Sequence, residues 1–222
     1  MRVVDLTQPL SPATTPWPGE QPVRIAEQAN VPADGYYARR VDLHEHTGTH
    51  FDAPAHFVEG GATVDEIAAG RLVVPVRVVD VSGQAADDPD YAVTVDDIRA
   101  MEREHGELAP GEALLALTGW DMHLADPERY VGAMRFPGFG ADAAELVVDR
   151  GLAGIGIDTL SVDRGCDDTF PVHHRTLPAG LWQLEGLVGL DLIPAVGAML
   201  VVGVPPVVGA SGFPARVLAL VP

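Results

Sequence analysis

The sequence predicts one domain of mixed α/β type that covers residues 1–222. Short runs with the apolar or alternating pattern of β-strands recur along the whole chain, and a few segments with helix caps lie between them. No internal repeat and no long linker separates one part of the chain from another. Many strands with a few inserted helices favour a single mixed α/β domain.

The expected strands are rich in β-branched and other apolar residues and are bounded by Gly, Pro or polar turns. They are 1–6, 23–28, 36–46, 72–81, 113–118, 154–158, 181–187, 198–204 and 215–221. The most apolar segment, 193–208, is interrupted by three prolines and is too short to span a bilayer. It therefore predicts a buried strand and its exit.

Three segments carry helix signals. Thr63 is placed to cap a short helix that begins at Val64, and Thr94 is placed to cap a helix of about three turns. The segment 140–151 contains good helix formers and ends at Gly151, a suitable C-terminal glycine.

Composition excludes several classes of function. The chain has 32 acidic and 14 basic residues, a net charge of −18, which disfavours nucleic acid and anionic membranes as partners. All basic residues are arginine, so a lysine Schiff base and a P-loop are both excluded. The single cysteine, Cys166, allows neither an internal disulfide nor a thiolate zinc site. No signal-peptide pattern is present at the N-terminus, so we expect a cytoplasmic protein.

The segment 44–57 contains four of the eight histidines. Its polar residues His46, His50, Asp52 and His56 all have even numbers, so extended backbone would project them to one side. A helix would turn Asp52 and His56 away from the other two, and a glycine and a proline within the segment also disfavour a helix. We therefore expect extended or gently bent backbone that gathers three imidazoles and a carboxylate.

Imidazole nitrogen with carboxylate oxygen is a ligand set for zinc, manganese or iron. Gly48 allows close approach of the backbone, Thr49 could orient a ligand through its hydroxyl, and Pro54 holds Ala53 extended. The alternative interpretation is a solvated, histidine-rich end of a strand. The density of polar groups favours a metal site.

The pattern from His46 to His56 resembles the H-x-G-T-H-x-D-x-P-x-H signature of the cyclase family, which includes bacterial kynurenine formamidase and isatin hydrolase. The similarity continues at 16–20, 156–163 and 212–218. The resemblance implies a mixed, barrel-like β-sheet surrounded by helices. It also implies a homodimer or a homotetramer.

The resemblance implies that one or two Zn²⁺ or Mn²⁺ ions bind in each subunit. The implied ligands are His46, His50, Asp52, His173 and Glu185. His173 is assigned to the second ion because it lies twelve residues before Glu185, whereas His174 lies eleven before it and is left as a neighbour. His56 matches the acid–base residue of the family.

An ion on these ligands would activate water, and His56 could take a proton from that water and return it to a leaving nitrogen. The leading hypothesis is a metal-dependent amidohydrolase similar to kynurenine formamidase, which releases formate from an N-formyl aryl amine. The alternative is opening of a cyclic amide or lactone, as in isatin hydrolase. A non-catalytic metal-binding module is the remaining possibility, and it would show no hydrolysis.

The substrate is expected to be a small and aromatic molecule. Trp17 lies between two prolines, and relatives use aromatic residues there to pack against a ring; burial under a rigid turn is the alternative. Arg39, Arg40 and Arg175 could each bind a substrate carboxylate, although most arginines lie at the surface.

Overall fold

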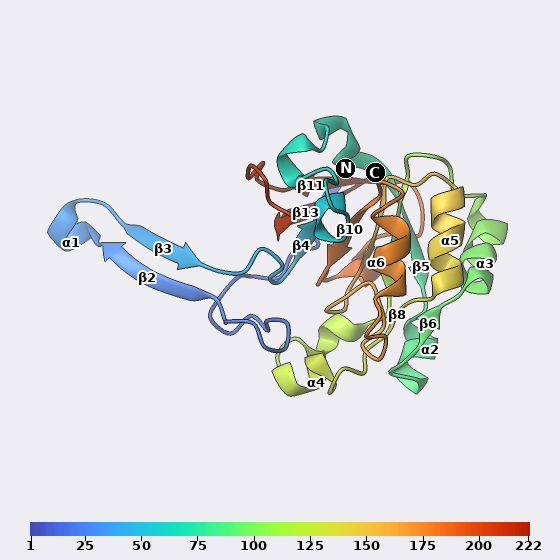
Figure 1. Cartoon of the computed structure of the whole chain (residues 1–222), viewed down its shortest axis with the longest axis horizontal. Helices are drawn as coiled ribbons and strands as arrows, with labels where there is room; N and C mark the ends of the chain where they lie inside the picture. Colours follow the sequence, from blue (N-terminus) through green and yellow to red (C-terminus); the bar gives the residue numbers. More distant parts are fainter.

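The computed structural model describes residues 1–222 and has a curled, nine-stranded sheet at its centre (Figure 1). The strands of this sheet are β1 (Arg2–Asp5), β4 (His50–Asp52), β5 (Val73–Asp80), β7 (Ala113–Leu117), β9 (Gly154–Ile157), β10 (Trp182–Glu185), β11 (Ala198–Gly203), β12 (Gly212–Pro214) and β13 (Arg216–Val221). Their order is β1-β13-β11-β5-β7-β9-β10-β4-β12. The central strands β5, β7, β9 and β10 are parallel, and antiparallel strands flank them on both sides.

The helices are short and lie mainly along one side of the sheet (Figure 1). They are α1 (Val31–Asp34), α2 (Ser82–Asp87), α3 (Val95–His105), α4 (Pro127–Val131), α5 (Ala141–Asp149) and α6 (Pro171–Thr176). Single 3-10 turns are η1 (Pro54–His56), η2 (Val64–Glu66), η3 (Ala69–Arg71), η4 (Trp120–His123) and η5 (Leu190–Leu192). A second, two-stranded parallel pair joins β6 (Ala92–Val93) to β8 (Gly138–Phe139).

Two apolar cores explain why the sheet holds together. All residues of β7 are buried, because its side chains alternate between two faces that are both covered. Leu114 and Ala116 belong to the core shared with α3 and α5, whereas Ala113 and Leu115 belong to the core inside the curl of the sheet. The predicted α/β fold with a mixed, barrel-like sheet and surrounding helices is confirmed.

The predicted helix starts are confirmed with one difference in helix type. Thr94 caps α3 and forms a capping box with Asp97, and α5 ends before Gly151, whose φ is 68°. Thr63 also forms a capping box, but the helix it begins is only the 3-10 turn η2. None of the helices is long and apolar enough to cross a membrane.

The strand predicted at 36–46 is shorter than expected and lies outside the main sheet. β3 (Ala38–Asp42) pairs only with β2 (Arg24–Ala29), and the two strands form an arm that extends away from the body of the molecule (Figure 1). Ala29 is the only buried residue of these two strands. The strands β4 and β12 have only three residues each and were not expected as separate strands, although β4 lies within the segment expected to be extended.

A buried carboxylate ties the ends of two central strands together. Asp158 follows β9, has no exposed surface, and accepts hydrogen bonds from the backbone N–H groups of Thr118 and Gly119. It also accepts a hydrogen bond of 2.5 Å from the hydroxyl of Thr118, at the end of β7. Burial raises the pKa of Asp158 to about 7 against these hydrogen bonds.

We expect the stabilising contribution of Asp158 to fall as the pH rises from about 4 to about 7. In this range the folded protein binds a proton that the unfolded chain has released, which changes the free energy of unfolding by at most about 1.4 kcal/mol per pH unit. Asp158→Asn removes the titration. The difference in unfolding free energy between the unchanged protein and this variant should therefore shrink between pH 5 and pH 7 in urea titrations. A constant difference would show that the three donors keep the carboxylate ionised.

Candidate active site

The short strand β4 brings two of the predicted ligands into the interior. It lies between β10 and β12, and its register places His50 directly opposite Glu185. Directly opposite residues point to the same face of a sheet, and Asp52, two residues after His50, shares that face. All three residues are buried, and Asp52 has no exposed surface.

The backbone on either side of β4 is turned, not extended. Gly48 adopts a left-handed φ of 65°, and the 3-10 turn η1 begins at Pro54, immediately after Ala53. Ala53 itself is extended, as predicted. The prediction of one continuous extended segment is therefore wrong outside β4. The two turns fold back so that the rings of His46 and His56 stack with centroids 3.8 Å apart.

Helix α6 delivers His173 to the same place. The imidazole Nδ1 of His173 lies 2.5 Å from Oδ2 of Asp163, which also accepts the backbone N–H of His173, while Oδ1 accepts that of Val172. These bonds aim Nε2 of His173 toward Glu185 and Asp52. His173 is buried, whereas His174 is exposed and does not line the cavity beside the cluster.

The donor atoms of the cluster lie close enough to share cations. Nε2 of His50 is 3.3 Å from Oδ1 of Asp52 and 3.4 Å from Oε2 of Glu185. Nε2 of His173 is 3.4 Å from the other oxygen of Glu185 and 3.8 Å from Oδ2 of Asp52. The two carboxylates therefore each extend one oxygen toward His50 and the other toward His173.

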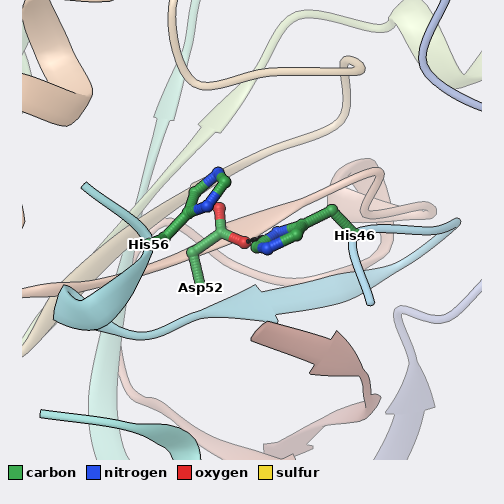
Figure 2. A group of neighbouring side chains, drawn as sticks. All are labelled: His46, Asp52 and His56. Carbon is green, nitrogen blue, oxygen red and sulfur yellow. Dashed lines mark hydrogen bonds and ion pairs between the residues drawn. The ribbon is translucent and has the colours of Figure 1, made fainter. Parts of the chain in front are cut away.

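His46 and His56 flank Asp52 on either side, as Figure 2 shows. Nδ1 of His46 is 2.6 Å from Oδ1 of Asp52. One donor atom from each of His46, Asp52 and His56 lies within 4.8 Å of the others, and the same holds for His50, Asp52 and Glu185. The structure thus brings together every residue that the sequence predicted as a ligand or proton carrier.

Two buried atoms in the cluster lack a hydrogen-bond partner: Nε2 of His50 and Oδ2 of Asp52. Such unpaired polar atoms are costly in a protein interior and require a partner. The spacings of 3.3 and 3.4 Å around His50 equal those of ligand atoms around a tetrahedral ion with bonds of about 2.0–2.1 Å. The residues present therefore fit a divalent cation.

The electrostatics of the cluster favour positive charge. Burial opposes the charged form of His173, but the hydrogen bonds to Asp163 and Asp52 and the charge of Glu185 raise its pKa to about 10. The pKa of His50 is likewise raised well above its ordinary value against burial, by Asp52 and Glu185. Burial opposes ionisation of Asp52, yet the nearby imidazoles hold its pKa well below the ordinary value.

His56 differs from the other imidazoles of the cluster. Burial, reinforced by the neighbouring imidazoles, lowers its pKa to about 4, so that it is neutral at pH 7. No side chain or carbonyl fixes its ring through a hydrogen bond, whereas Nδ1 of His50 is bound to the carbonyl of Gly48 at 3.0 Å. A neutral imidazole with free nitrogen atoms can accept and release a proton.

A cavity of about 240 Å³ opens above the cluster. Its walls include the aromatic side chains of Trp17, Phe57, Tyr130 and Phe170, and no arginine lines it. Trp17 is half-buried and its ring lies 6.1 Å from that of Phe170. Trp17 also packs against the apolar cluster of Trp120, Tyr130, Phe136 and Leu160, so a structural role and a role in substrate binding both stay predictions.

The three arginines considered as carboxylate binders lie elsewhere. Arg39 and Arg40 are exposed on β3 of the arm, and Arg175 is 3.6 Å from Glu145. The expected role of Thr49 is also corrected. Its hydroxyl donates to the carbonyl of Gly186 at 2.5 Å and does not orient a ligand.

Sequence reasoning did not identify Asp163 as a partner of His173, nor Ser211 as a partner of His46 and Glu45. Asp163 was noted only as part of a shared pattern, and Ser211 is separated from His46 by 165 residues. No local signal connects such pairs, because their contact depends on strand order. Only the packing of β12 against β4 brings Ser211 to the cluster.

A curled α/β sheet with imidazoles and bridging carboxylates below an aromatic cavity defines a metal-dependent hydrolase. The chain belongs to the family described as Putative cyclase, whose model matches residues 4–164. The family prediction from the histidine-rich segment is therefore confirmed.

Individual relatives are hydrolases that match most of the chain. Isatin hydrolase of Roseibium aggregatum is 36% identical over 192 residues, covering 81% of this chain and 73% of the relative. Kynurenine formamidase of Salinibacter ruber is 30% identical over 220 residues, covering 97% and 96%. The crystal structure of an isatin hydrolase bound to the product analogue thioisatinate superposes with a TM-score of 0.93 at 33% identity, covering 99% and 92%. The predicted enzyme class, a metal-dependent hydrolase, is confirmed.

The variant Asp163→Asn should weaken cation binding at His173, probed with zinc, by about 10- to 100-fold, because an amide cannot satisfy the ring of His173 and both backbone donors at once. Zinc titration of the metal-free protein measures this, with Asp167→Asn as control, since Asp167 contacts only Arg164 at a partly exposed site. Equal affinities in the two variants would contradict a role for Asp163 in orienting His173.

Proposed function

We propose that the protein hydrolyses the amide bond of a small aromatic molecule, with one or two Zn²⁺ or Mn²⁺ ions held by the buried cluster. The proposed ligands are His46, His50, Asp52, His173 and Glu185. The main support is that Asp52 and Glu185 each direct separate oxygens to His50 and His173, which leaves two adjacent positions for cations. Nitrogen and oxygen donors of this kind suit both metals.

A divalent ion bound there supplies Lewis acidity, which makes a water molecule acidic enough to act as a nucleophile at neutral pH. The protein's part is to fix the ligands, and the hydrogen bonds to Asp163 and to the carbonyl of Gly48 do this for His173 and His50. Phe57 packs 4.5 Å from the ring of His173 and covers it. The side chains thus keep a narrow set of orientations without rearrangement during the reaction.

His56 is the proposed proton carrier. It is neutral at pH 7, lies beside Asp52, and has no hydrogen bond that would hold its proton on one nitrogen. It can accept a proton from the attacking water and pass it to the nitrogen of the leaving group, which departs poorly unless it is protonated. The neighbouring acidic residue Asp52 stabilises the positive charge that His56 acquires between these steps.

The cavity favours a cyclic amide over the substrate that the sequence first suggested. N-formylkynurenine carries a carboxylate, and no arginine lines the cavity to bind it. The acidic side chain of Glu20, which also lines the cavity, suits the ammonium group of that substrate but gives its carboxylate no cationic partner. Isatin is an uncharged, flat bicyclic amide, which suits the aromatic walls, and Trp17 is placed to pack against such a ring. We therefore place isatin-like ring opening ahead of formamidase activity.

We also propose that residues 1–222 act as one hydrolase domain in a homo-oligomer, as homodimer or homotetramer. The site draws on residues from Trp17 to Ser211, so no part of the chain holds it alone. The arm of β2 and β3 supports assembly, because an isolated two-stranded hairpin is only marginally stable and its Val31, Tyr36 and Tyr37 are exposed. The cytoplasmic location stays a prediction.

Replacing His56 distinguishes a role as proton carrier from a role as metal ligand. His56→Ala should retain its metal content while kcat falls by about 10²- to 10⁴-fold. Metal per subunit and turnover are measured on the same sample, with His105→Ala, at the distant end of α3, as control. Loss of metal together with loss of activity would identify His56 as a metal ligand. Near-normal turnover would show that His56 takes no part in the reaction.

The substrate proposal is tested by comparing isatin with N-formylkynurenine. The protein, stripped by a chelator and reloaded with zinc or manganese, should open isatin with a larger kcat/KM, and the chelated protein should be inactive. A larger kcat/KM for N-formylkynurenine would restore the formamidase hypothesis. Hydrolysis of neither would contradict both substrate assignments.

A further inference from the structure

The ring of His46 contacts Ser211, which is itself held by Glu45. Its Nε2 lies 3.0 Å from the hydroxyl oxygen of Ser211. That hydroxyl donates to Oε2 of Glu45 at 2.8 Å, and the backbone N–H of Ser211 donates to the same oxygen at 3.0 Å. The carbonyl of Ser211 accepts the N–H of Ala53 at 2.9 Å. Three hydrogen bonds of its own thus fix the position of Ser211.

The direction of these hydrogen bonds determines where the proton of His46 lies. A carboxylate only accepts hydrogen bonds, so the single proton of the Ser211 hydroxyl is directed to Glu45. The hydroxyl oxygen can then only accept from His46, which requires a proton on Nε2 of the imidazole. In the neutral ring, Nδ1 therefore carries the lone pair.

Nδ1 of His46 faces Oδ1 of Asp52 at 2.6 Å. A lone pair on this nitrogen and a carboxylate oxygen both accept, so this contact requires positive charge, which is either a second ring proton on Nδ1 or a metal ion. We propose that Glu45 and Ser211 are positioning residues that hold His46 in the Nε2–H form, so that His46 binds the metal ion through Nδ1. This inference rests on the proposal that His46 is a ligand.

His50 and His173 have the opposite arrangement. Nδ1 of His50 is bound to the carbonyl of Gly48, and Nδ1 of His173 is bound to Asp163, so each presents Nε2 to the cluster. In each of the three rings, one nitrogen faces Asp52 or Glu185, and the other nitrogen has a hydrogen-bond acceptor outside the cluster. The acceptor for His46 differs from the other two because it is supplied by a segment near the C-terminus.

The surroundings of the His46 ring keep it in this orientation. A Cβ atom at Gly212 would lie 2.4 Å from Cε1 and 2.9 Å from Nδ1 of His46, so the glycine leaves space that the ring occupies. The ring of His56 stacks on His46 at 3.8 Å with an angle of 23°. The short strand β12 thus begins with the glycine that leaves space for His46, and Ser211, the residue immediately before it, carries the hydroxyl that orients the ring.

Zinc binding to the full chain, measured by competition titration, tests the role of Glu45 and Ser211. Ser211→Ala should weaken zinc affinity by about 10- to 100-fold, and Ser211→Thr, which keeps the hydroxyl, should restore it. Glu45→Gln should give an intermediate loss, because its amide can donate to the serine and release the proton that was directed to Glu45. Glu59→Gln, an exposed glutamate, is the matched control.

The ligating nitrogen is read from imidazole ¹⁵N spectra of the zinc-loaded protein. We expect a protonated Nε2 and a zinc-shifted Nδ1 for His46, and the reverse pattern for His50 and His173. Zinc on Nε2 of His46, or equal affinity in the alanine variant and the unchanged protein, would overturn the inference. Equal weakening in the alanine and threonine variants would also overturn it, since packing and not the hydroxyl would then be responsible. Failure of the unchanged protein to bind zinc would overturn the proposed function as well.

Discussion

The burial of Asp52 is the constraint on which the rest of the site depends. This carboxylate has no exposed surface, and one of its oxygens makes no hydrogen bond. An ionised group in such a position is costly unless positive charge lies beside it. The surrounding imidazoles of His46, His50 and His173 supply part of this positive charge. Their orientation leaves room for a cation that would supply the rest. The chemistry of the protein therefore follows from a charge that the fold encloses.

The sheet is irregular at the place where it encloses this carboxylate. A strand of only three residues, β4, carries the central carboxylate, and sharp turns at Gly48 and Pro54 follow directly on both sides. Such a strand would be weak alone, but it is paired on both edges by β10 and β12. The rigid neighbouring strands and the short connections hold the polar groups close together. A longer, regular strand would instead place them in a row along its length.

The pattern of residues identified the chemistry of the site more completely than its geometry. The even spacing from His46 to His56 predicted that these polar residues gather, and the resemblance to the cyclase family supplied the pair of His173 and Glu185, so the sequence named all the residues that the structure brings together. The turns around β4 were missed because alternation of polar residues is also the signature of an extended strand. The partners Asp163, Glu45 and Ser211 were missed because ordinary polar residues gain these roles only through contacts distant in the chain.

The place of β12 in the site has a consequence for biosynthesis. The ring of His46 gains its contact with Ser211 only when the segment at 211–214 has paired with β4, although His46 is translated long before it. Contacts between residues so far apart in sequence form late, because closing the intervening chain costs entropy before the contacts themselves contribute favourable free energy. A nascent chain on the ribosome therefore carries the histidines of 44–57 without the partners that orient them until nearly the whole sequence has been synthesised.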